Sequence, residues 1–158
     1  MIEIETKHFG KLPVDAGQAI EFPAGLPAFE QERLFIPISH PRTEPLILLQ
    51  SVSTPGLCFL ALPVATVDPE YRLQLSGDDL RALDLAEPPG AEGSDLAVLA
   101  LVAVGTQGQV SANLMSPVVV NRANRRAVQA VRWDGEYQYN HPVAQLAGAA
   151  RGAERPCS

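Results

Sequence analysis

The sequence predicts an all-β, mainly antiparallel fold, built as a small β-barrel-like single domain with one or two short helices. First, its apolar runs are short and are separated by glycine and proline at the spacing typical of barrels and sandwiches. Second, nine apolar residues follow one another without a break at 96–104. Third, only residues 78–83 carry a convincing helical signal inside the chain. With 158 residues, 46% of them hydrophobic, one compact core is expected.

The first strand is predicted by alternation, because Ile2, Ile4 and Thr6 are interleaved with charged residues. That period of two is typical of a strand with one buried and one wet face. Gly10 then permits a turn into a second short segment. Further strand-like runs lie at residues 19–22, 34–38, 46–51, 57–64, 71–75, 96–104, 109–113, 117–120 and 127–133.

The run 96–104 is expected to be a strand buried on both faces and the centre of the fold. It is too short to cross a membrane. The Gly-Thr-Gln-Gly stretch at 105–108 is expected to be a hairpin turn and not a phosphate-binding loop, because it lacks the spacing of either glycine-rich motif.

The predicted helix at 78–83 can be capped at its N-terminus by Ser76 or Asp78. Residues 88–94 have the proline, glycine and acidic composition of a mobile surface loop. The segment 144–158 is rich in Ala, Gly and Arg and is expected to be a flexible or weakly helical tail. The folded domain is therefore predicted to span residues 1–143.

The net charge of −6 is unevenly distributed, because residues 1–95 carry 6 basic and 15 acidic residues while 96–158 carry 6 and 3. An acidic surface repels phosphate backbones, so no direct nucleic-acid binding is expected and a basic partner protein fits better. The alternative is that the acidic residues only keep the protein soluble, and the charge distribution alone does not decide between the two. Without a signal peptide or a long apolar run, the chain is expected to be cytoplasmic and not membrane-bound.

The sequence carries no recognisable catalytic motif, so no enzymatic activity is expected. The nucleophile elbow G-x-S-x-G and the phosphate-binding glycine motifs do not occur. The three histidines, His8, His40 and His141, have no second ligand at the spacing of a metal site, so no metal or cofactor is expected. Asp78 and Asp79 are adjacent and point in different directions, which excludes an acid-base pair.

Three segments of the chain, in order, carry motifs of one protein family. Residues 20–30, IEFPAGLPAFE, are similar to the family's F-x-x-G-[IL]-P-G-F, and residues 45–51, PLILLQS, are similar to P-F-x-x-L-Q-S. The most specific is ANLMSPVVVN at 112–121, which resembles A-N-L-x-A-P-[IV]-[IV]-[IV]-N and is followed by Gln129 at the usual distance. The central part adds Phe59 and Tyr71 at the expected intervals. Together, these features resemble the FliW family of flagellar assembly factors over about residues 1–142.

Two positions depart from the family pattern, because Ala28 and Ala127 stand where the family usually has glycine. Alanine at these positions implies that neither needs a positive φ in this chain.

The resemblance implies a protein-protein switch. A FliW protein binds the translational regulator CsrA and relieves its repression of flagellin mRNA translation, while flagellin competes for FliW. The free protein is expected to be monomeric. The alternative is a cofactor-binding small barrel, such as a flavin-binding split barrel, since small barrels often hold ligands.

Motif residues are interpreted as fold determinants, because Asn and Gln side chains readily bond nearby backbone and Gly-x-Pro favours a rigid turn. They are Phe22, Gly25, Pro27, Gln50, Ser51, Asn113, Pro117, Asn121 and Gln129. A second set, chosen for acidic or aromatic side chains beside turn-forming residues, is predicted to bind the partner. It consists of Phe29, Glu30, Glu44, Asp68, Glu70 and Tyr71. For Tyr71, burial in the core is the open alternative.

Overall fold

A computed structural model describes residues 2–6, 10–39, 41–42, 44–86 and 95–143. The expected mobile loop at 88–94 and the tail at 144–158 lie outside these residues. Within the described part of the chain, no helix has the length and apolar character needed to span a bilayer.

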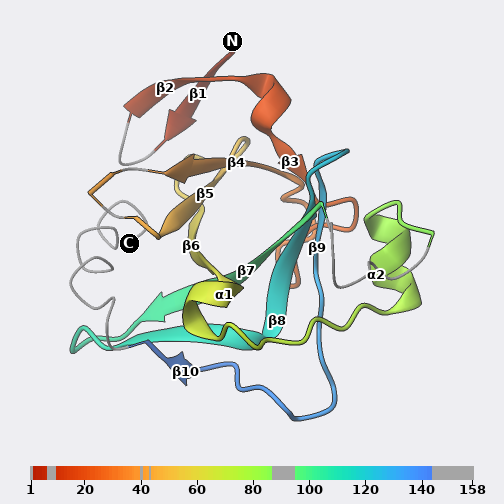
Figure 1. Cartoon of the computed structure of the whole chain (residues 1–158). Coiled ribbons are helices and arrows are strands. Elements are labelled where there is room, and N and C mark those ends of the chain that lie inside the picture. Colours follow the sequence, from red (N-terminus) through yellow and green to blue (C-terminus); the bar gives the residue numbers. More distant parts are fainter. Residues whose placement is uncertain (1, 7–9, 40, 43, 87–94, 144–158) are drawn as a thin grey trace.

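Short strands dominate the chain, as the sequence predicts (Figure 1). The strands are β1 (Ile2–Thr6), β2 (Gly10–Val14), β3 (Ile20–Glu21), β4 (Leu34–Ser39), β5 (Ile47–Ser51), β6 (Cys58–Pro63), β7 (Leu96–Val104), β8 (Val110–Asn121), β9 (Arg126–Gln129) and β10 (His141–Pro142). The helical elements are a 3-10 turn η1 (Ala16–Gln18) and the helices α1 (Val64–Val67) and α2 (Gly77–Ala82).

Seven of these strands close into a barrel. The strand order runs β8-β7-β6-β5-β4-β3-β9, and β9 returns to pair with β8, which completes the ring. Every neighbouring pair in the ring is antiparallel except β3 and β9, which are parallel. The predicted mainly antiparallel barrel is therefore confirmed.

The inside of the ring is filled by side chains. One hydrophobic cluster takes a residue from each of the seven strands, which places it within the barrel. Its strand members include Ile20, Phe35, Leu49, Ala61, Leu99, Val118, Val120 and Ala127. Phe22, completely buried just after β3, packs edge-on against the ring of Phe35 with 5.5 Å between centroids. A seven-stranded barrel is narrow enough for side chains to fill it.

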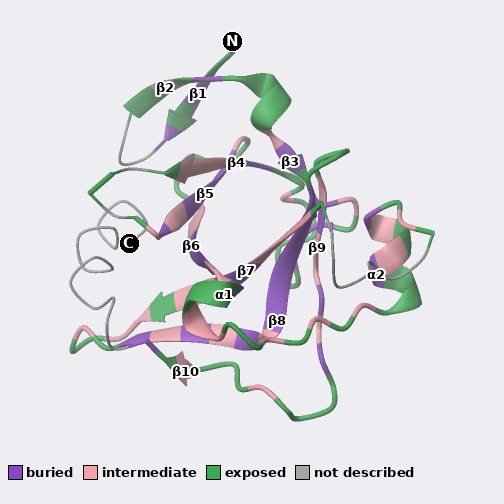
Figure 2. Cartoon of the chain, in the orientation of Figure 1, coloured by how far each residue is buried: buried purple, intermediate pink, exposed green. Residues whose placement is uncertain are grey.

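The outer faces of the barrel strands are covered in three places. Figure 1 shows the β1-β2 hairpin above β4 and α2 beside β9. The hairpin packs Ile4 and Val14 on Ile36 of β4, whereas Leu83 after α2 packs on Val119 of β8. A third apolar cluster joins α1 to strands β5 to β8. Figure 2 accordingly shows buried residues concentrated on β8 and exposed residues along β1 and β2.

Strand β7 has the predicted bounds, and it pairs with β6 and β8. The expectation that it is buried on both faces is wrong. Only Leu99 and Ala100 are fully buried, and Ala103 is exposed. The strand lies in the wall of a barrel, so its outer face is covered only where α1 and its neighbours lie over it.

Strand β8 unites two segments that the sequence analysis treats as separate strands. Between the pairs Leu99–Val118 and Leu101–Asn113, residues 114–117 of β8 lie opposite a single residue of β7. Asn113 holds this insertion, because its side-chain oxygen accepts hydrogen bonds from the backbone N–H groups of Met115 (3.1 Å) and Ser116 (3.0 Å). Asn113 thus stabilises a bulge inside one long strand.

Other local expectations have mixed outcomes. The helix is confirmed and begins after Ser76, whose hydroxyl accepts from the Asp79 N–H while the Asp79 carboxylate accepts from the Ser76 N–H. The predicted strand at 71–75 does not form, because this segment runs beside the barrel without pairing into the sheet. Two short elements are not predicted from the sequence, namely α1 with four residues and β10 with two.

The segment after Gly25 forms a turn, as expected, and its geometry corrects the expectation for Ala28. Leu26 and Phe29 exchange backbone hydrogen bonds of 2.8 and 3.3 Å across Pro27 and Ala28. Proline at the second position and a positive φ at the third, 69° at Ala28, are the pattern of a type II turn. Ala28 therefore adopts the conformation for which glycine is preferred, whereas Ala127 is an ordinary strand residue in β9.

We expect Ala28→Gly to stabilise the protein by roughly 0.5–1 kcal/mol. The left-handed conformation costs alanine about 1–2 kcal/mol, a strain that glycine avoids. Glycine also makes the unfolded chain more flexible, which lowers the stability by about 0.4–1 kcal/mol. Urea unfolding measures the difference. The matched control is Ala24→Gly in the same segment, where φ is not positive and only the flexibility term applies. Destabilisation by both variants alike would contradict the strain at Ala28.

Candidate partner-binding site

Two motif residues of β5 hold the β5-β6 hairpin. The buried amide of Gln50 lies within 3.1 Å of the carbonyls of Ser51 and Leu57. The hydroxyl of Ser51 donates to the carboxylate of Glu32 (2.7 Å) and accepts from the Thr54 N–H (3.0 Å). Hydrogen bonds from the hydroxyls of Thr54 and Ser51 lower the pKa of Glu32. These contacts fasten the segment before β4 to the hairpin, so Gln50 and Ser51 have structural roles.

The remaining motif residues stabilise β8. Asn121 is buried and donates from its side-chain amide to the Leu83 carbonyl (2.9 Å), which ties α2 to the end of the strand. Gln129 donates to the Ser116 carbonyl (3.0 Å), and the Pro117 carbonyl accepts from the backbone of Ala130 (2.9 Å). The motif that carries the family resemblance therefore builds the frame of the barrel.

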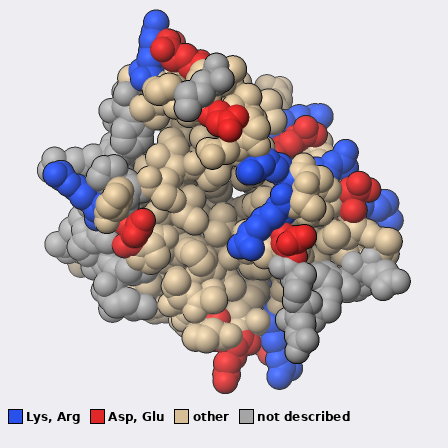
Figure 3. Space-filling model, turned by 45° about the horizontal axis from the view of Figure 1, so that its top comes forward, with Lys and Arg blue, Asp and Glu red and all other residues tan. Residues whose placement is uncertain are grey.

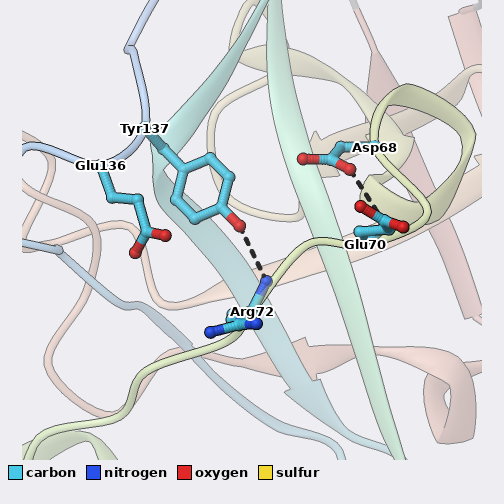
Figure 4. A pocket seen from close by; sticks show the side chains of 5 residues that line it. All are labelled: Asp68, Glu70, Arg72, Glu136 and Tyr137. Atoms are coloured by element: carbon cyan, nitrogen blue, oxygen red, sulfur yellow. Dashed lines mark hydrogen bonds between the residues drawn. The ribbon is translucent and has the colours of Figure 1, made fainter.

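A shallow acidic depression of about 520 Å³ lies beside this frame. We call it the acidic depression and define it by its lining residues, which are Asp68, Glu70, Arg72, Glu136 and Tyr137. Figure 4 shows Asp68 and Glu70 on one side, Glu136 and Tyr137 on the other, and Arg72 between them. The first three come from the connection that follows α1, and the last two from the connection between β9 and β10.

Tyr71 joins the two connections beneath the depression. Its hydroxyl donates to the carbonyl of Leu114 in the β8 insertion at 2.6 Å, and its ring lies 4.4 Å from the ring of Tyr137. The Tyr137 hydroxyl in turn accepts from the backbone N–H of Arg72 at 3.1 Å. Burial raises the pKa of Tyr71, so the phenol remains a neutral donor at neutral pH.

Arg132 is the buried cation of this site, with only 3% of its surface exposed. Its guanidinium pairs with the carboxylates of Asp134 (2.5 Å) and Glu136 (2.9 Å) and donates to the Arg72 carbonyl. It also lies 4.6 Å from the centre of the Tyr137 ring, within cation-π range. The hydrogen bond with Asp134 raises the pKa of Arg132 and lowers that of Asp134.

The structure brings together three of the six predicted partner-binding residues. Asp68 and Glu70 line the acidic depression, whereas Tyr71 is half-buried with its hydroxyl engaged, which matches the alternative of a structural role. The other three lie elsewhere. Phe29 (42% exposed) and Glu30 are in the segment before β4, with the Phe29 ring against Phe59, and Glu44 is exposed between β4 and β5.

Sequence reasoning missed Arg132, Glu136 and Tyr137. A signal was present, because residues 132–139 read RWDGEYQY, where aromatic and charged residues are interleaved around a glycine. Such a composition is typical of binding loops. The segment instead reads as the end of a strand when only its apolar residues are considered.

Charges are mixed on the face seen in Figure 3, where Lys and Arg side chains are interspersed with Asp and Glu around a broad uncharged area. The negative charge is therefore not gathered into one field on that face. Among the residues that the structure describes, no group of three or more His, Cys, Asp or Glu side chains is arranged to hold a metal ion.

Known proteins similar to this chain are flagellar assembly factors. The chain is 34% identical to the flagellar assembly factor FliW of Treponema pallidum over 99% of this chain and 100% of that protein. It is 32% identical to a FliW of Desulfitobacterium hafniense over 97% and 100%, and 29% identical to that of Bacillus subtilis over 89% and 95%.

The fold agrees with these relatives. A crystal structure of the flagellar assembly factor FliW superposes with a TM-score of 0.76 at 27% identity, covering 89% of this chain and 96% of that one. The FliW protein family model matches residues 3–143, which include the whole barrel and both sides of the acidic depression. The chain belongs to the FliW protein family.

Proposed function

We propose that this protein controls flagellin level by exchanging partners in the cytoplasm. It binds CsrA and thereby relieves repression of flagellin mRNA translation, and flagellin competes for it as flagellin accumulates. The observation that carries the proposal is the continuous match to the FliW family from residue 3 to residue 143, with curated relatives named flagellar assembly factors. No chemical step is required of the protein, because its action is to bind and release.

The filled barrel favours this function over the cofactor-binding alternative. A ligand held inside the ring of strands is disfavoured, because the ring encloses a cluster of aliphatic and aromatic side chains. A purified protein without a flavin absorption band is expected, and a yellow flavin-loaded product would support the alternative.

We further propose that Asp68 and Glu70 belong to the CsrA contact. Complementary charge acts mainly on the rate of encounter, so Asp68→Lys with Glu70→Lys is expected to slow association with CsrA by about tenfold at low salt. The defect shrinks as ionic strength rises, because salt screens exposed charges. Surface-binding kinetics at two salt concentrations measure both effects.

The matched control is Glu3→Lys with Glu5→Lys on β1, where both side chains are exposed. This pair changes the net charge by the same amount at a different place. Equal slowing by the two double variants would mean that overall charge and not the acidic depression guides the encounter. Unchanged association in the first double variant would place the contact elsewhere, with the acidic helix α2 as the next segment to test.

A further inference from the structure

We infer that the loop between β9 and β10 and the acidic depression together form one docking surface for a basic segment of a partner protein, with Trp133 as its anchor. We call residues 131–140 the aromatic loop. The partner used to test this inference rests on the proposed function, whereas the surface itself is argued from the loop.

Two large aromatic side chains of the aromatic loop point away from the protein core. Trp133, the single tryptophan of the chain, is 89% exposed, and Tyr139 is 64% exposed. Exposing tryptophan to water is costly, since its ring carries a large hydrophobic area. Tryptophan and tyrosine are also the residues most enriched among those that dominate binding energy. An exposed pair in one loop is therefore a feature of an interface.

The aromatic loop is held in place from below. Arg132 is buried and bound to Asp134 and Glu136, Tyr137 stacks on Tyr71, and the Gln138 carbonyl accepts from the Leu114 N–H at 2.9 Å. Trp133 and Tyr139 lie directly beside these anchors in the sequence and are exposed. The loop thus loses most of its conformational entropy when the protein folds, and little more is lost when a partner binds.

The charge of the surface selects the partner. The aromatic loop and the acidic depression carry four carboxylates and two guanidinium groups, a net −2, from Asp68, Glu70, Asp134, Glu136, Arg72 and Arg132. Arg132 pairs with Asp134 and Glu136 beneath the loop and offsets part of their charge, so the surface as a whole remains negative. Lysine or arginine side chains of a partner can pair with the carboxylates and lie over the face of an exposed aromatic ring. The occupant that fits is a basic protein segment.

The single tryptophan makes the test direct, because intrinsic tryptophan emission reports on Trp133 alone. Purified full-length protein is titrated with CsrA, and separately with a synthetic arginine- and lysine-rich peptide. The expected result is a blue shift of the emission and protection from acrylamide quenching as the indole leaves water. By calorimetry, Trp133→Ala is expected to raise the Kd for CsrA at least about tenfold.

Two control variants, circular dichroism and sedimentation separate the outcomes. Trp133→Phe keeps an aromatic ring and is expected to retain most of the affinity, whereas Ile2→Ala removes an exposed apolar side chain from β1 and is expected to leave the Kd unchanged. Trp133 is exposed, so circular dichroism of its variants is expected to match the parent protein. Sedimentation at rising concentration tests whether the surface instead joins two copies of the chain.

The docking surface is refuted if CsrA binds with unchanged Trp133 emission and Trp133→Ala keeps the parental Kd, a result that leaves the proposed function intact. Conversely, an absence of CsrA binding would contradict the proposed function. A peptide-induced blue shift would then still support the surface, whereas no shift with either probe would refute it. Self-association that buries Trp133 would also overturn the assignment of a basic partner.

Discussion

Gly25→Ala is expected to lower the free energy of unfolding by roughly 2–5 kcal/mol. Gly25 has a φ of 71°, so a side chain there costs about 1–2 kcal/mol in backbone strain. An added Cβ would also lie 2.4 Å from the carbonyl oxygen and 2.5 Å from the Cα of Glu30. These are backbone atoms, so the turn must open, and overpacking of this kind adds about 1–3 kcal/mol.

The matched control is Gly135→Ala, because Gly135 has a nearly identical φ of 72° and open space around its would-be Cβ. Gly135→Ala introduces the backbone strain of a positive φ without a steric collision of the added Cβ. Urea unfolding of the two variants therefore measures the contribution of the close approach to Glu30. Equal destabilisation would mean that the turn yields freely and that Phe29 and Glu30 are not held rigidly by it.

Leu99→Ala is expected to destabilise the protein by about 2–5 kcal/mol. Leu99 is buried inside the barrel, in the cluster to which all seven ring strands contribute. Removing its side chain loses the burial of three carbon atoms and leaves a cavity that a closed barrel cannot collapse easily. Urea unfolding with constant slope measures the loss directly.

Leu34→Ala provides the comparison for Leu99→Ala. The chemical change is the same and Leu34 also lies in a strand, but its side chain is 43% exposed at the edge of β4. A loss well below that of Leu99→Ala, under about 1 kcal/mol, is expected. Similar losses at the two positions would contradict the placement of Leu99 in the interior of the barrel.

Most strands of this fold are predictable from local sequence, because glycine and proline end them and short apolar runs fill them. The bounds of β7 are predicted correctly, and those of β4 to β6 nearly so. Ring closure is not predictable in this way, since the contact of β9 with β3 joins residues about a hundred positions apart. A long-range pairing depends on the whole set of strands and leaves little trace in any one segment.

The candidate site is predictable only in part, for a related reason. Asp68 and Glu70 are recognisable because acidic residues beside Pro69 indicate an exposed connection. The role of Tyr71 is decided by a hydrogen bond to Leu114, 43 residues away, and its neighbour Arg132 reads as an ordinary charged residue in the sequence. Charged residues are seldom buried, so local pattern assigns them to the surface.

The insertion in β8 lies between Asn113 and Val118 and supplies three backbone acceptors. Within those residues, the Leu114 carbonyl receives the Tyr71 hydroxyl, the Met115 carbonyl receives the Arg132 N–H and the Ser116 carbonyl receives the Gln129 amide. A shift of β8 along its neighbouring segments would break all three hydrogen bonds. The insertion thus fixes the register of β8. One edge of the strand pairs with β9, which closes the barrel, and further along with β10.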